Sequence, residues 1–255
     1  MSLKNKRFWI IGASSGIGAA LAQALAKDGA QIALSARRSE KLEDVKDTLE
    51  GEGHIVIPVD VSDLSAIKDG LEAIQKEWDG IDSVIYMAAT YFATQKEREN
   101  IDNIEKSINI NLLGAMRTVD VVKPYFDKKG AGQIVITGSI AGYRGLPNGQ
   151  PYCATKAALN NYAESLKIEL EPHNIDVRLI CPGFVETDLT AKNKFDMPMI
   201  IKPEEAAEYI VKGLKRDNFE IHFPKQFTLF MKLVDVLPRA LYFMLGRTIR
   251  DKADN

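Results

Sequence analysis

Short apolar runs alternate along this chain with longer stretches in which apolar residues recur at helical spacing. Residues 8–11 are typical of a buried strand, and Ile17, Leu21 and Leu25 then recur as on one face of a helix. Similar apolar runs predict further strands at 31–35, 54–59, 83–87, 133–137, 176–181 and 219–223. Helices are expected between them, at 39–49, 62–78, 101–126, 151–170 and 203–214.

This alternation predicts the fold class, because strand–helix–strand units build parallel sheets with helices on both faces. Helix ends are indicated by Ser39 as a cap, Pro124 as a disturbance near the end of 101–126, and Pro203 as a first helical residue. No Ser-, Pro- or Gly-rich seam divides the chain. We expect one α/β domain over residues 1–255, a doubly wound Rossmann-type parallel sheet of about seven strands. Residues 224–255 form an apolar and basic C-terminal helical extension of it.

Composition narrows the function classes. Of the 255 residues, 45% are hydrophobic and 27% charged, and a net charge of -2 gives no electrostatic sign of nucleic-acid binding. Cys153 and Cys181 form no CxxC motif and have no histidine cluster near them. We therefore expect no disulfide framework, no metal site and a reducing cytoplasm. No stretch reaches the roughly 18 apolar residues that span a bilayer, and the N-terminus does not have the usual design of a signal peptide.

A glycine-rich segment, Gly12-Ala-Ser-Ser-Gly-Ile-Gly18, follows the first strand and opens the first helix. Glycines permit a tight turn and a close approach of the backbone to a pyrophosphate, and the helix N-terminus supplies free amides. The alternative, a plain turn, does not need this strand–helix context. The sequence predicts a dinucleotide site formed here by Gly12, Ser14, Ser15, Gly16, Ile17 and Gly18.

The end of the second strand indicates which dinucleotide is preferred. An NAD site favours an acidic residue about 20 residues beyond the glycines, to bind the ribose hydroxyls. Here the segment reads Ser35-Ala-Arg37-Arg38, and no acid occurs before Glu40. Two guanidinium groups suit a 2′-phosphate, so we expect NADP(H) in preference to NAD(H). The alternative is a pair of solvated surface charges.

Candidate chemistry comes from Tyr152 and Lys156, four residues apart on a predicted helix face, with Ser139 thirteen residues upstream. A neighbouring ammonium favours a phenolate and is expected to lower the pKa of Tyr152 from about 10. Such a phenol can give and take protons near neutral pH, while a serine hydroxyl polarises a carbonyl. Tyr125 and Lys129 have the same spacing, so the spacing alone does not choose between the two pairs.

Taken together, the motifs resemble the short-chain dehydrogenase/reductase family over residues from about Lys6 to Phe223. Their joint order makes the resemblance specific, and it excludes Tyr125 and Lys129, because residue 112 is leucine and Gly130 follows at once. The motifs are, in order, Gly12 to Gly18, Asp60-Val61, Asn111-Leu-Leu-Gly114, Ser139, Tyr152-Cys-Ala-Thr-Lys156 and Pro182-Gly-Phe-Val-Glu-Thr187.

The resemblance implies an NADP(H)-dependent oxidoreductase of a carbonyl or a secondary alcohol, with four catalytic residues. Tyr152 gives or takes the proton, and Lys156 lowers its pKa and holds the nicotinamide ribose. Ser139 binds the substrate oxygen, and Asn111 keeps a water that connects Lys156 to solvent. A regulator that binds NADP(H) without turnover is the alternative, and the presence of all four residues argues against it.

Further positions are implied as cofactor contacts. Asp60 and Val61 would flank the adenine, Thr187 would reach the carboxamide, and the remaining contacts line the nicotinamide side or lie near the fourth strand. The remaining contacts are Ala88, Ala89, Pro182, Gly183 and Val185.

The resemblance also implies a homodimer or homotetramer built through helices 101–126 and 151–170.

The chain departs from the family pattern at two places. Ile11 stands where the family usually has threonine, and residues 86–89 read Tyr-Met-Ala-Ala where it usually has Asn-Asn-Ala-Gly. Polar groups are missing on both sides, and replacing both ends of a hydrogen bond by apolar groups can be nearly neutral. We therefore expect Ile11 to pack against Tyr86 and Met87.

Apolar residues beyond the strand ends predict a lipophilic carbonyl or alcohol as substrate, accompanied by one cation. In open α/β sheets ligands bind beyond the carboxyl ends of the strands. Core packing beneath a lid is the alternative for part of the set. The set is Tyr91, Phe92, Tyr143, Arg144, Phe184, Leu189, Phe195, Met197 and Met199.

Residues 227–245 are apolar at near-helical spacing, and Pro238 is expected to break or kink this segment. Three interpretations remain open: a cover for the pocket or a subunit interface, a helix lying in a membrane surface, or a mobile tail. The second would make the protein membrane-peripheral. It is favoured by the cations Lys225, Lys232, Arg239, Arg247 and Arg250.

Overall fold

A computed structural model describes residues 2–92, 100–193 and 196–253. Its centre is a seven-stranded sheet in the order β3-β2-β1-β4-β5-β6-β7, in which every neighbouring pair is parallel. This confirms the doubly wound α/β fold. The strands are β1 (Arg7–Ile11), β2 (Gln31–Ser35), β3 (Ile55–Val56), β4 (Ser83–Tyr86), β5 (Gly132–Thr137), β6 (Ile175–Pro182) and β7 (Glu220–Phe223).

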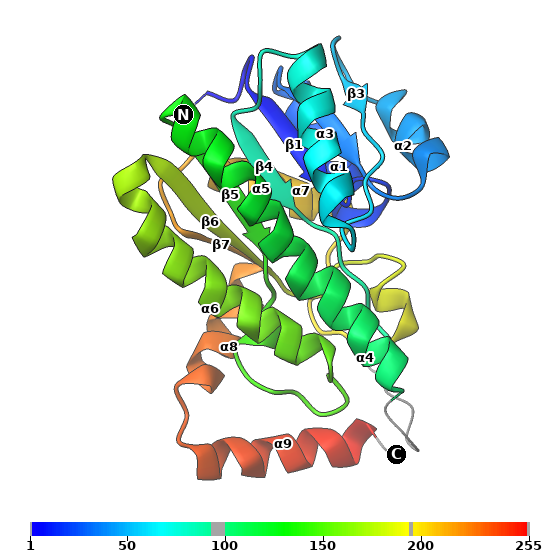
Figure 1. Ribbon diagram of the computed structural model, residues 1–255. Helices are drawn as coiled ribbons and strands as arrows, with labels where there is room; N and C mark the ends of the chain where they lie inside the picture. The colour runs from blue at the N-terminus through cyan, green and yellow to red at the C-terminus, as the bar shows by residue number, and fades with distance from the viewer. Residues whose placement is uncertain (1, 93–99, 194–195, 254–255) are drawn as a thin grey trace.

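Helices cover both faces of the sheet, with α3, α5 and α6 side by side on one face (Figure 1). Within β1, Trp9 belongs to the core on that face, and Ile10 belongs to the core on the other face with α1 and α7. Both faces are buried, so the strands are continuously apolar. The helices before the extension are α1 (Gly16–Lys27), α2 (Ser39–Lys46), α3 (Leu64–Glu77), α4 (Ile101–Ser107), α5 (Gly114–Lys129), α6 (Tyr152–Leu170) and α7 (Pro203–Leu214).

Strand order reverses direction at β1, between β2 and β4. The crossover helices therefore leave to opposite sides at this point, and a crevice opens beyond the carboxyl ends of β1 and β4. The glycine-rich segment follows β1, so the fold places it at the crevice.

Two expected boundaries in the first half of the chain are wrong. The third strand has two residues, and beyond it the chain still runs alongside β2, because Ile57 and Val59 donate to Leu34 and Ala36. Ser39 is the first helical residue of α2 and not its cap, since the extended backbone at Arg38 occupies the cap position.

The expected helix 101–126 is interrupted and then continues past its predicted end. A π-helical segment, Ile108–Leu113, separates α4 from α5. Pro124 lies inside α5 without ending it, because Val122 and Phe126 on either side are fully buried against the sheet. The helix ends at Gly130, whose φ of 74° is left-handed and whose N–H bonds to Phe126.

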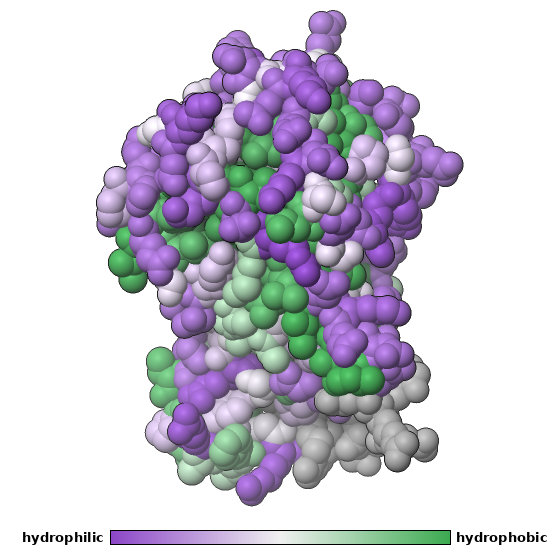
Figure 2. Space-filling view, in the orientation of Figure 1, coloured by the Kyte–Doolittle hydropathy of each residue, from purple (hydrophilic) through white to green (hydrophobic). Residues whose placement is uncertain are grey.

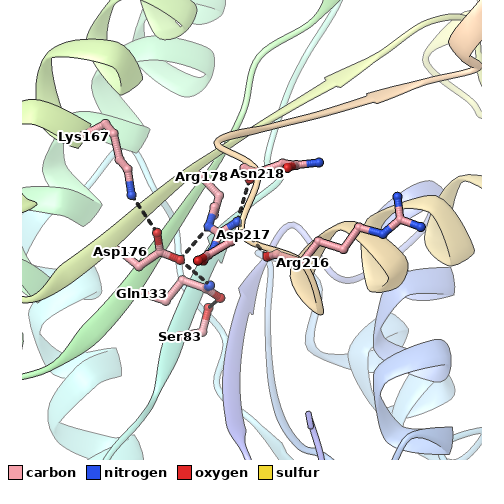
Figure 3. A network of polar contacts seen from close by, with 8 residues as sticks. All are labelled: Ser83, Gln133, Lys167, Asp176, Arg178, Arg216, Asp217 and Asn218. Carbon is pink, nitrogen blue, oxygen red and sulfur yellow. Dashed lines mark hydrogen bonds and ion pairs between the residues drawn. The ribbon is translucent and has the colours of Figure 1, made fainter. Parts of the chain in front are cut away.

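A polar network joins the amino ends of β4, β5 and β6, at the end of the sheet opposite the crevice (Figure 3). Arg178 is buried and donates to Asp176 at 2.6 Å, to Asp217 at 3.0 Å and to the carbonyl of Asn218 at 2.6 Å. Gln133 and Lys167 donate to Asp176 as well. The buried guanidinium is thus paired on several sides, as a buried charge requires.

The extension forms two packed helices, α8 (Lys225–Asp235) and α9 (Arg239–Ala253), and Pro238 separates them as expected. Figure 1 shows α9 at the lower end of the molecule, beneath the loop that leads into α6. Arg144 on that loop donates to the carbonyls of Asp235 and Leu237, and Tyr242 donates to the carbonyl of Gly145. Among the described residues, no helix combines the length and apolarity that crossing a bilayer requires.

The apolar replacement between the first and fourth strands is confirmed. Ile11 pairs with Tyr86 in the parallel register, and the amide of Met87 donates to the carbonyl of Ile11 at 2.7 Å. The Tyr86 hydroxyl donates instead to the carbonyl of Ile110 in the π-helical segment. The chain therefore links β4 to that segment through a tyrosine.

Candidate active site

A cavity of about 400 Å³ opens beyond the carboxyl ends of β1, β2, β4, β5 and β6. It contains every residue that the sequence predicts as a cofactor contact, and also Ser139. Besides Tyr152 and Lys156, the predicted contacts in its lining are Gly12, Ser14, Ser15, Gly16, Ile17, Gly18, Arg37, Arg38, Asp60, Val61, Ala88, Ala89, Pro182, Gly183, Val185 and Thr187.

The glycine loop is tight enough to exclude side chains. Gly12 has a φ of +99°, and a Cβ there would lie 2.5 Å from the amide nitrogen of Ala88. A Cβ on Gly18 would lie 2.1 Å from the carbonyl oxygen of Gly12. At the start of α1, Ser15 makes no side-chain cap bond, so the first-turn amides remain for an anion. This cradle fits the pyrophosphate of a dinucleotide.

Charge gathers at the end of β2. Arg37 and Arg38 are exposed residues at the cavity wall. Burial works to raise the pKa of Asp60, but hydrogen bonds from Ser62 and the charge of Arg37 outweigh it and hold that pKa below its usual value. Since Asp60 accepts from both the amide and the hydroxyl of Ser62, its carboxylate is fixed in place.

Tyr152 and Lys156 lie one turn apart at the start of α6. The Nζ of Lys156 is 5.6 Å from the centroid of the Tyr152 ring and donates to the carbonyl of Thr137 at 2.7 Å. Burial lowers the pKa of Lys156 to about 8. The ammonium is therefore held between β5 and the phenol, and it loses its proton more readily than an exposed lysine does.

The expected lowering of the pKa of Tyr152 is wrong for this structure. Burial raises the pKa of the phenol above its ordinary value, and the hydrogen bond with Ser139 only partly offsets the rise. The cause is the desolvated position of the phenol, while the nearby Nζ is directed at a carbonyl oxygen. A raised pKa keeps the phenol protonated at neutral pH, which is the state of a proton donor.

Ser139 is oriented by its own backbone surroundings. It precedes the short 3₁₀ turn Ile140–Gly142, and its Oγ accepts from the amide of Ala141 at 3.1 Å. The same Oγ donates weakly to the carbonyl of Pro182 at 3.5 Å. The hydroxyl is thus fixed between β5 and β6, close to the phenol.

Asn111 lies behind the cavity wall, fully buried in the π-helical segment. Its Oδ1 accepts from the amide of Thr90 at 2.7 Å, and its Nδ2 donates to the carbonyl of Thr90 at 2.9 Å and to Thr155 at 3.2 Å. The side chain joins the segment after β4 to α6. Its expected role in holding a water stays a prediction.

The second tyrosine–lysine pair, Tyr125 and Lys129, lies at the opposite end of the sheet, next to the start of β4. The Tyr125 hydroxyl accepts from the amide of Ile81 at 2.9 Å, and Lys129 donates to the carbonyl of Ile81 at 2.6 Å and to Asp82 at 2.9 Å. These contacts fasten the end of α5 to the start of β4. The pair is structural.

Comparison with known proteins identifies the family. Residues 6–197 match the family described as short chain dehydrogenase. The chain belongs to this family. It is therefore an NAD(P)-dependent oxidoreductase acting on CH–OH groups of small molecules, and the sequence resemblance is confirmed.

Relatives of this short chain dehydrogenase match it over most of both chains. An uncharacterized oxidoreductase of Myxococcus xanthus is 34% identical over 94% of this chain and 96% of its own. An NADP-dependent 3-hydroxy acid dehydrogenase of Schizosaccharomyces pombe is 35% identical over 86% and 91%. A short chain dehydrogenase of Burkholderia cenocepacia in complex with NADP has a TM-score of 0.84 at 22% identity, over 96% of this chain and 99% of its own.

The substrate side of this dehydrogenase differs in part from expectation. Tyr91 and Leu189 line the cavity, and the Tyr91 ring meets the Tyr152 ring edge-on at 5.6 Å. Tyr143 and Arg144 do not line it, because Tyr143 donates to Glu220 and Arg144 binds the extension. Phe195 lies outside the described residues. Of the other expected residues, those that the cavity lining does not include are Phe92, Phe184, Met197 and Met199.

Several residues that line the cavity belong to no family motif, so the sequence did not predict them as site residues. Thr137 contributes its backbone carbonyl to Lys156, and its own hydroxyl is buried without a partner. Thr190 donates to the carbonyl of Val185 and fixes the loop that bears Thr187. Lys192, at the end of that loop, also faces the cavity. These residues come together only through the fold.

Proposed function

We propose that this chain is an NADP(H)-dependent oxidoreductase in which Tyr152 is the general acid and base. Hydride passes between the nicotinamide and the carbon of a carbonyl or secondary alcohol. The observation that carries the proposal is that Tyr152, Lys156 and Ser139 line the same cavity as the glycine loop.

Each residue has a role that follows from its contacts. When bound, the nicotinamide supplies or accepts the hydride. The Ser139 hydroxyl binds the carbonyl oxygen, and Tyr152 donates its proton to that oxygen as the alcohol forms; the reverse reaction returns the proton. Lys156 lies 5.6 Å from the Tyr152 ring, where its charge stabilises the phenolate left behind. Asn111 positions this group by joining Thr90 to Thr155.

NADP(H) is the preferred dinucleotide in this proposal. Arg37 and Arg38 stand at the end of β2, where a 2′-phosphate would lie. The relative from Schizosaccharomyces pombe is named as NADP-dependent, and the Burkholderia cenocepacia structure holds NADP. The contacts at the adenine and nicotinamide ends are those that line the cavity, from Asp60 and Val61 to Thr187.

The proposed substrate has an apolar body. Val185, Leu189 and Tyr91 are apolar residues of the cavity lining, and the Tyr91 ring lies against the Tyr152 ring. The Schizosaccharomyces pombe relative is named for 3-hydroxy acids. A secondary alcohol flanked by a short apolar chain, or the matching ketone, fits both observations.

We further infer that the single domain assembles as a homodimer or homotetramer in the cytoplasm. Exposed apolar residues lie along α4, the π-helical segment and α6, and Figure 2 shows apolar surface on the face that these helices occupy in Figure 1. A second copy would cover this face. Its residues include Ile101, Ile108, Leu113 and Ile168.

The outer surface of α8 and α9 is proposed to rest on an anionic membrane. Leu233 on α8, Val236 just after it and Phe243 on α9 are exposed, and the exposed cations Arg239 and Arg247 both lie on α9. An apolar face with neighbouring arginines complements lipid tails and anionic headgroups.

The test is replacement of Tyr152 by phenylalanine, followed through NADPH absorbance with a panel of ketones and 3-oxo acids. General acid catalysis contributes about 10²–10⁴-fold, so we expect a loss of that order in kcat with NADPH binding unchanged. Near-normal turnover by the variant would contradict the assignment of Tyr152. Absence of turnover by the unaltered chain, despite NADPH binding, would contradict the enzyme function.

A further inference from the structure

One cation in the cavity has no role in the chemistry described above. Among the described residues that line the cavity, the cationic ones are Arg37, Arg38, Lys156 and Lys192. The two arginines suit a 2′-phosphate, and Lys156 serves Tyr152. Lys192 remains, on the loop that follows β6.

The contacts of Lys192 place its ammonium against Tyr91 and Phe92, at the end of the segment that follows β4. Its Nζ donates to the carbonyl of Tyr91 at 3.0 Å and lies 5.9 Å from the centroid of the Phe92 ring. The Tyr91 ring in turn meets the Tyr152 ring at 5.6 Å. Tyr91 therefore contacts the ammonium through its backbone carbonyl and Tyr152 through its ring, and all three residues line the same cavity.

The loop that carries Lys192 is fixed by its own hydrogen bonds. The hydroxyl of Thr190 donates to the carbonyl of Val185, and the amide of Thr187 donates to that hydroxyl at 3.0 Å. The short turn Thr190–Lys192 then ends at the lysine. The ammonium is thus presented from a defined backbone.

The known partners of the ammonium leave it able to bind an anion. A lysine ammonium has three donors, and among the described residues its partners are a carbonyl oxygen and an aromatic ring, neither of which carries a charge. Asp188 also lines the cavity, on the same loop. A substrate carboxylate would meet a positive charge at Lys192 and would be repelled near Asp188, so it would be held on the lysine side.

We propose that Lys192 binds a carboxylate on the substrate, which makes the substrate class an oxo acid or its hydroxy acid. This proposal rests on the proposed function. The carbonyl lies at Tyr152 and Ser139, and the carboxylate lies at Lys192, next to Tyr91. The lysine contacts the substrate and sets specificity, and it takes no part in proton or hydride transfer.

The experiment compares each acid with its neutral ester. Acetoacetate and 3-oxohexanoate are assayed beside their methyl esters, with saturating NADPH, for the unaltered chain, Lys192→Met and Lys192→Arg. A charge-assisted hydrogen bond contributes about 1.5–3 kcal/mol, so Lys192→Met should lower kcat/KM for the acids about 10- to 100-fold. The esters should change less than about twofold, and Lys192→Arg should restore most of the loss.

Controls separate this proposal from its rivals. Lys68→Met removes an exposed lysine on α3 and should leave all four substrates unchanged. Equal losses for acids and esters in Lys192→Met would overturn the proposal and indicate a structural role for the lysine. A raised KM for NADPH would overturn it in favour of a cofactor contact. If the unaltered chain consumes NADPH with none of the acids and none of the esters, the proposed function itself is overturned.

Discussion

At the scale of single residues, burial shifts the pKa values of the two titratable groups at the site in opposite directions. Burial raises the pKa of Tyr152 and lowers that of Lys156 to about 8. In the proposed mechanism the phenol would therefore hold its proton until a carbonyl oxygen develops negative charge beside it. Lys156, with its pKa lowered to about 8, would then pass a proton on to refill the phenol. Opposed shifts of this kind are typical of an acid–base pair.

The proposed preference for NADP(H) also depends on single residues. The double variant Arg37→Ala/Arg38→Ala should raise KM for NADPH about 10- to 100-fold, because each guanidinium–phosphate bond is charge-assisted. The KM for NADH should change less than about threefold, since NADH has no 2′-phosphate. Steady-state kinetics with both dinucleotides provide the measurement. Parallel losses for the two would contradict a phosphate role and indicate damage to the adenosine site.

At the scale of elements, the network around Arg178 predicts where the sheet is most sensitive. Arg178→Met removes the closest charged partner of the half-buried Asp176, which keeps Gln133 and Lys167, and losing hydrogen bonds to a charged group costs about 1.5–3 kcal/mol. Urea unfolding should show a loss of that order. Arg216→Met is the matched control, because only its backbone carbonyl joins the network and its side chain points away (Figure 3). A loss below about 1 kcal/mol for Arg178→Met would contradict this account.

The same network determines in which direction the free energy of unfolding changes with pH. Burial works to raise the pKa of Asp176, but bonds from Gln133, Arg178 and Lys167 outweigh it and hold that pKa below 3.8. A lowered folded-state pKa contributes stability above the unfolded pKa, and the contribution is lost as pH falls through the folded value. The difference in unfolding free energy between the unaltered chain and Arg178→Met should therefore shrink below about pH 4. A difference that stays constant with pH would count against the pairing.

The local sequence pattern predicted the bounds of an element well where they do not depend on contacts with distant parts of the chain. The strand 31–35 and the helix from Pro203 to Leu214 have the expected bounds. The π-helical segment was not predictable, because it depends on Asn111 meeting Thr90 and Thr155 across the fold. For the same reason sequence assigned Arg144 to the substrate side, whereas its guanidinium binds carbonyls of the extension 91 and 93 residues away.

Cofactor positions were more accessible to sequence than substrate positions. The glycine loop, Asp60 and Pro182 are specified by backbone geometry at strand ends, and such positions recur with fixed motifs. Lys192 has no motif, and its proximity to Tyr91 follows only from how the loop after β6 packs over the end of β4. A substrate site built from loops therefore has to be read from the structure.

At the scale of the whole molecule, α8 and α9 show different chemistry on their two sides. Met231, Val234 and Tyr242 face inward and are buried, and none of the described residues of these helices lines the cavity. The outward side is apolar, with Val236 at 74% exposed and Leu233 at 63%. The extension is thus a packed platform with an uncovered apolar surface. This arrangement contradicts the mobile-tail and pocket-cover interpretations, and a membrane surface or a subunit interface remains as a proposal for that surface.

The membrane proposal leads to a test on intact chain. With vesicles of phosphatidylcholine and phosphatidylglycerol, the unaltered protein should co-sediment, and less of it should do so with phosphatidylcholine alone. Each arginine near an anionic surface contributes about 1 kcal/mol, so Arg239→Ser/Arg247→Ser should weaken binding about 30-fold. Leu233→Ser/Phe243→Ser should weaken binding to both vesicle types, since it removes buried apolar area. Ile200→Ser, an exposed change on the loop before α7, is the control that should bind as before. If the protein stays in the supernatant and Leu233→Ser/Phe243→Ser instead halves the mass measured in solution, the uncovered surface is an interface between copies and the membrane proposal is wrong.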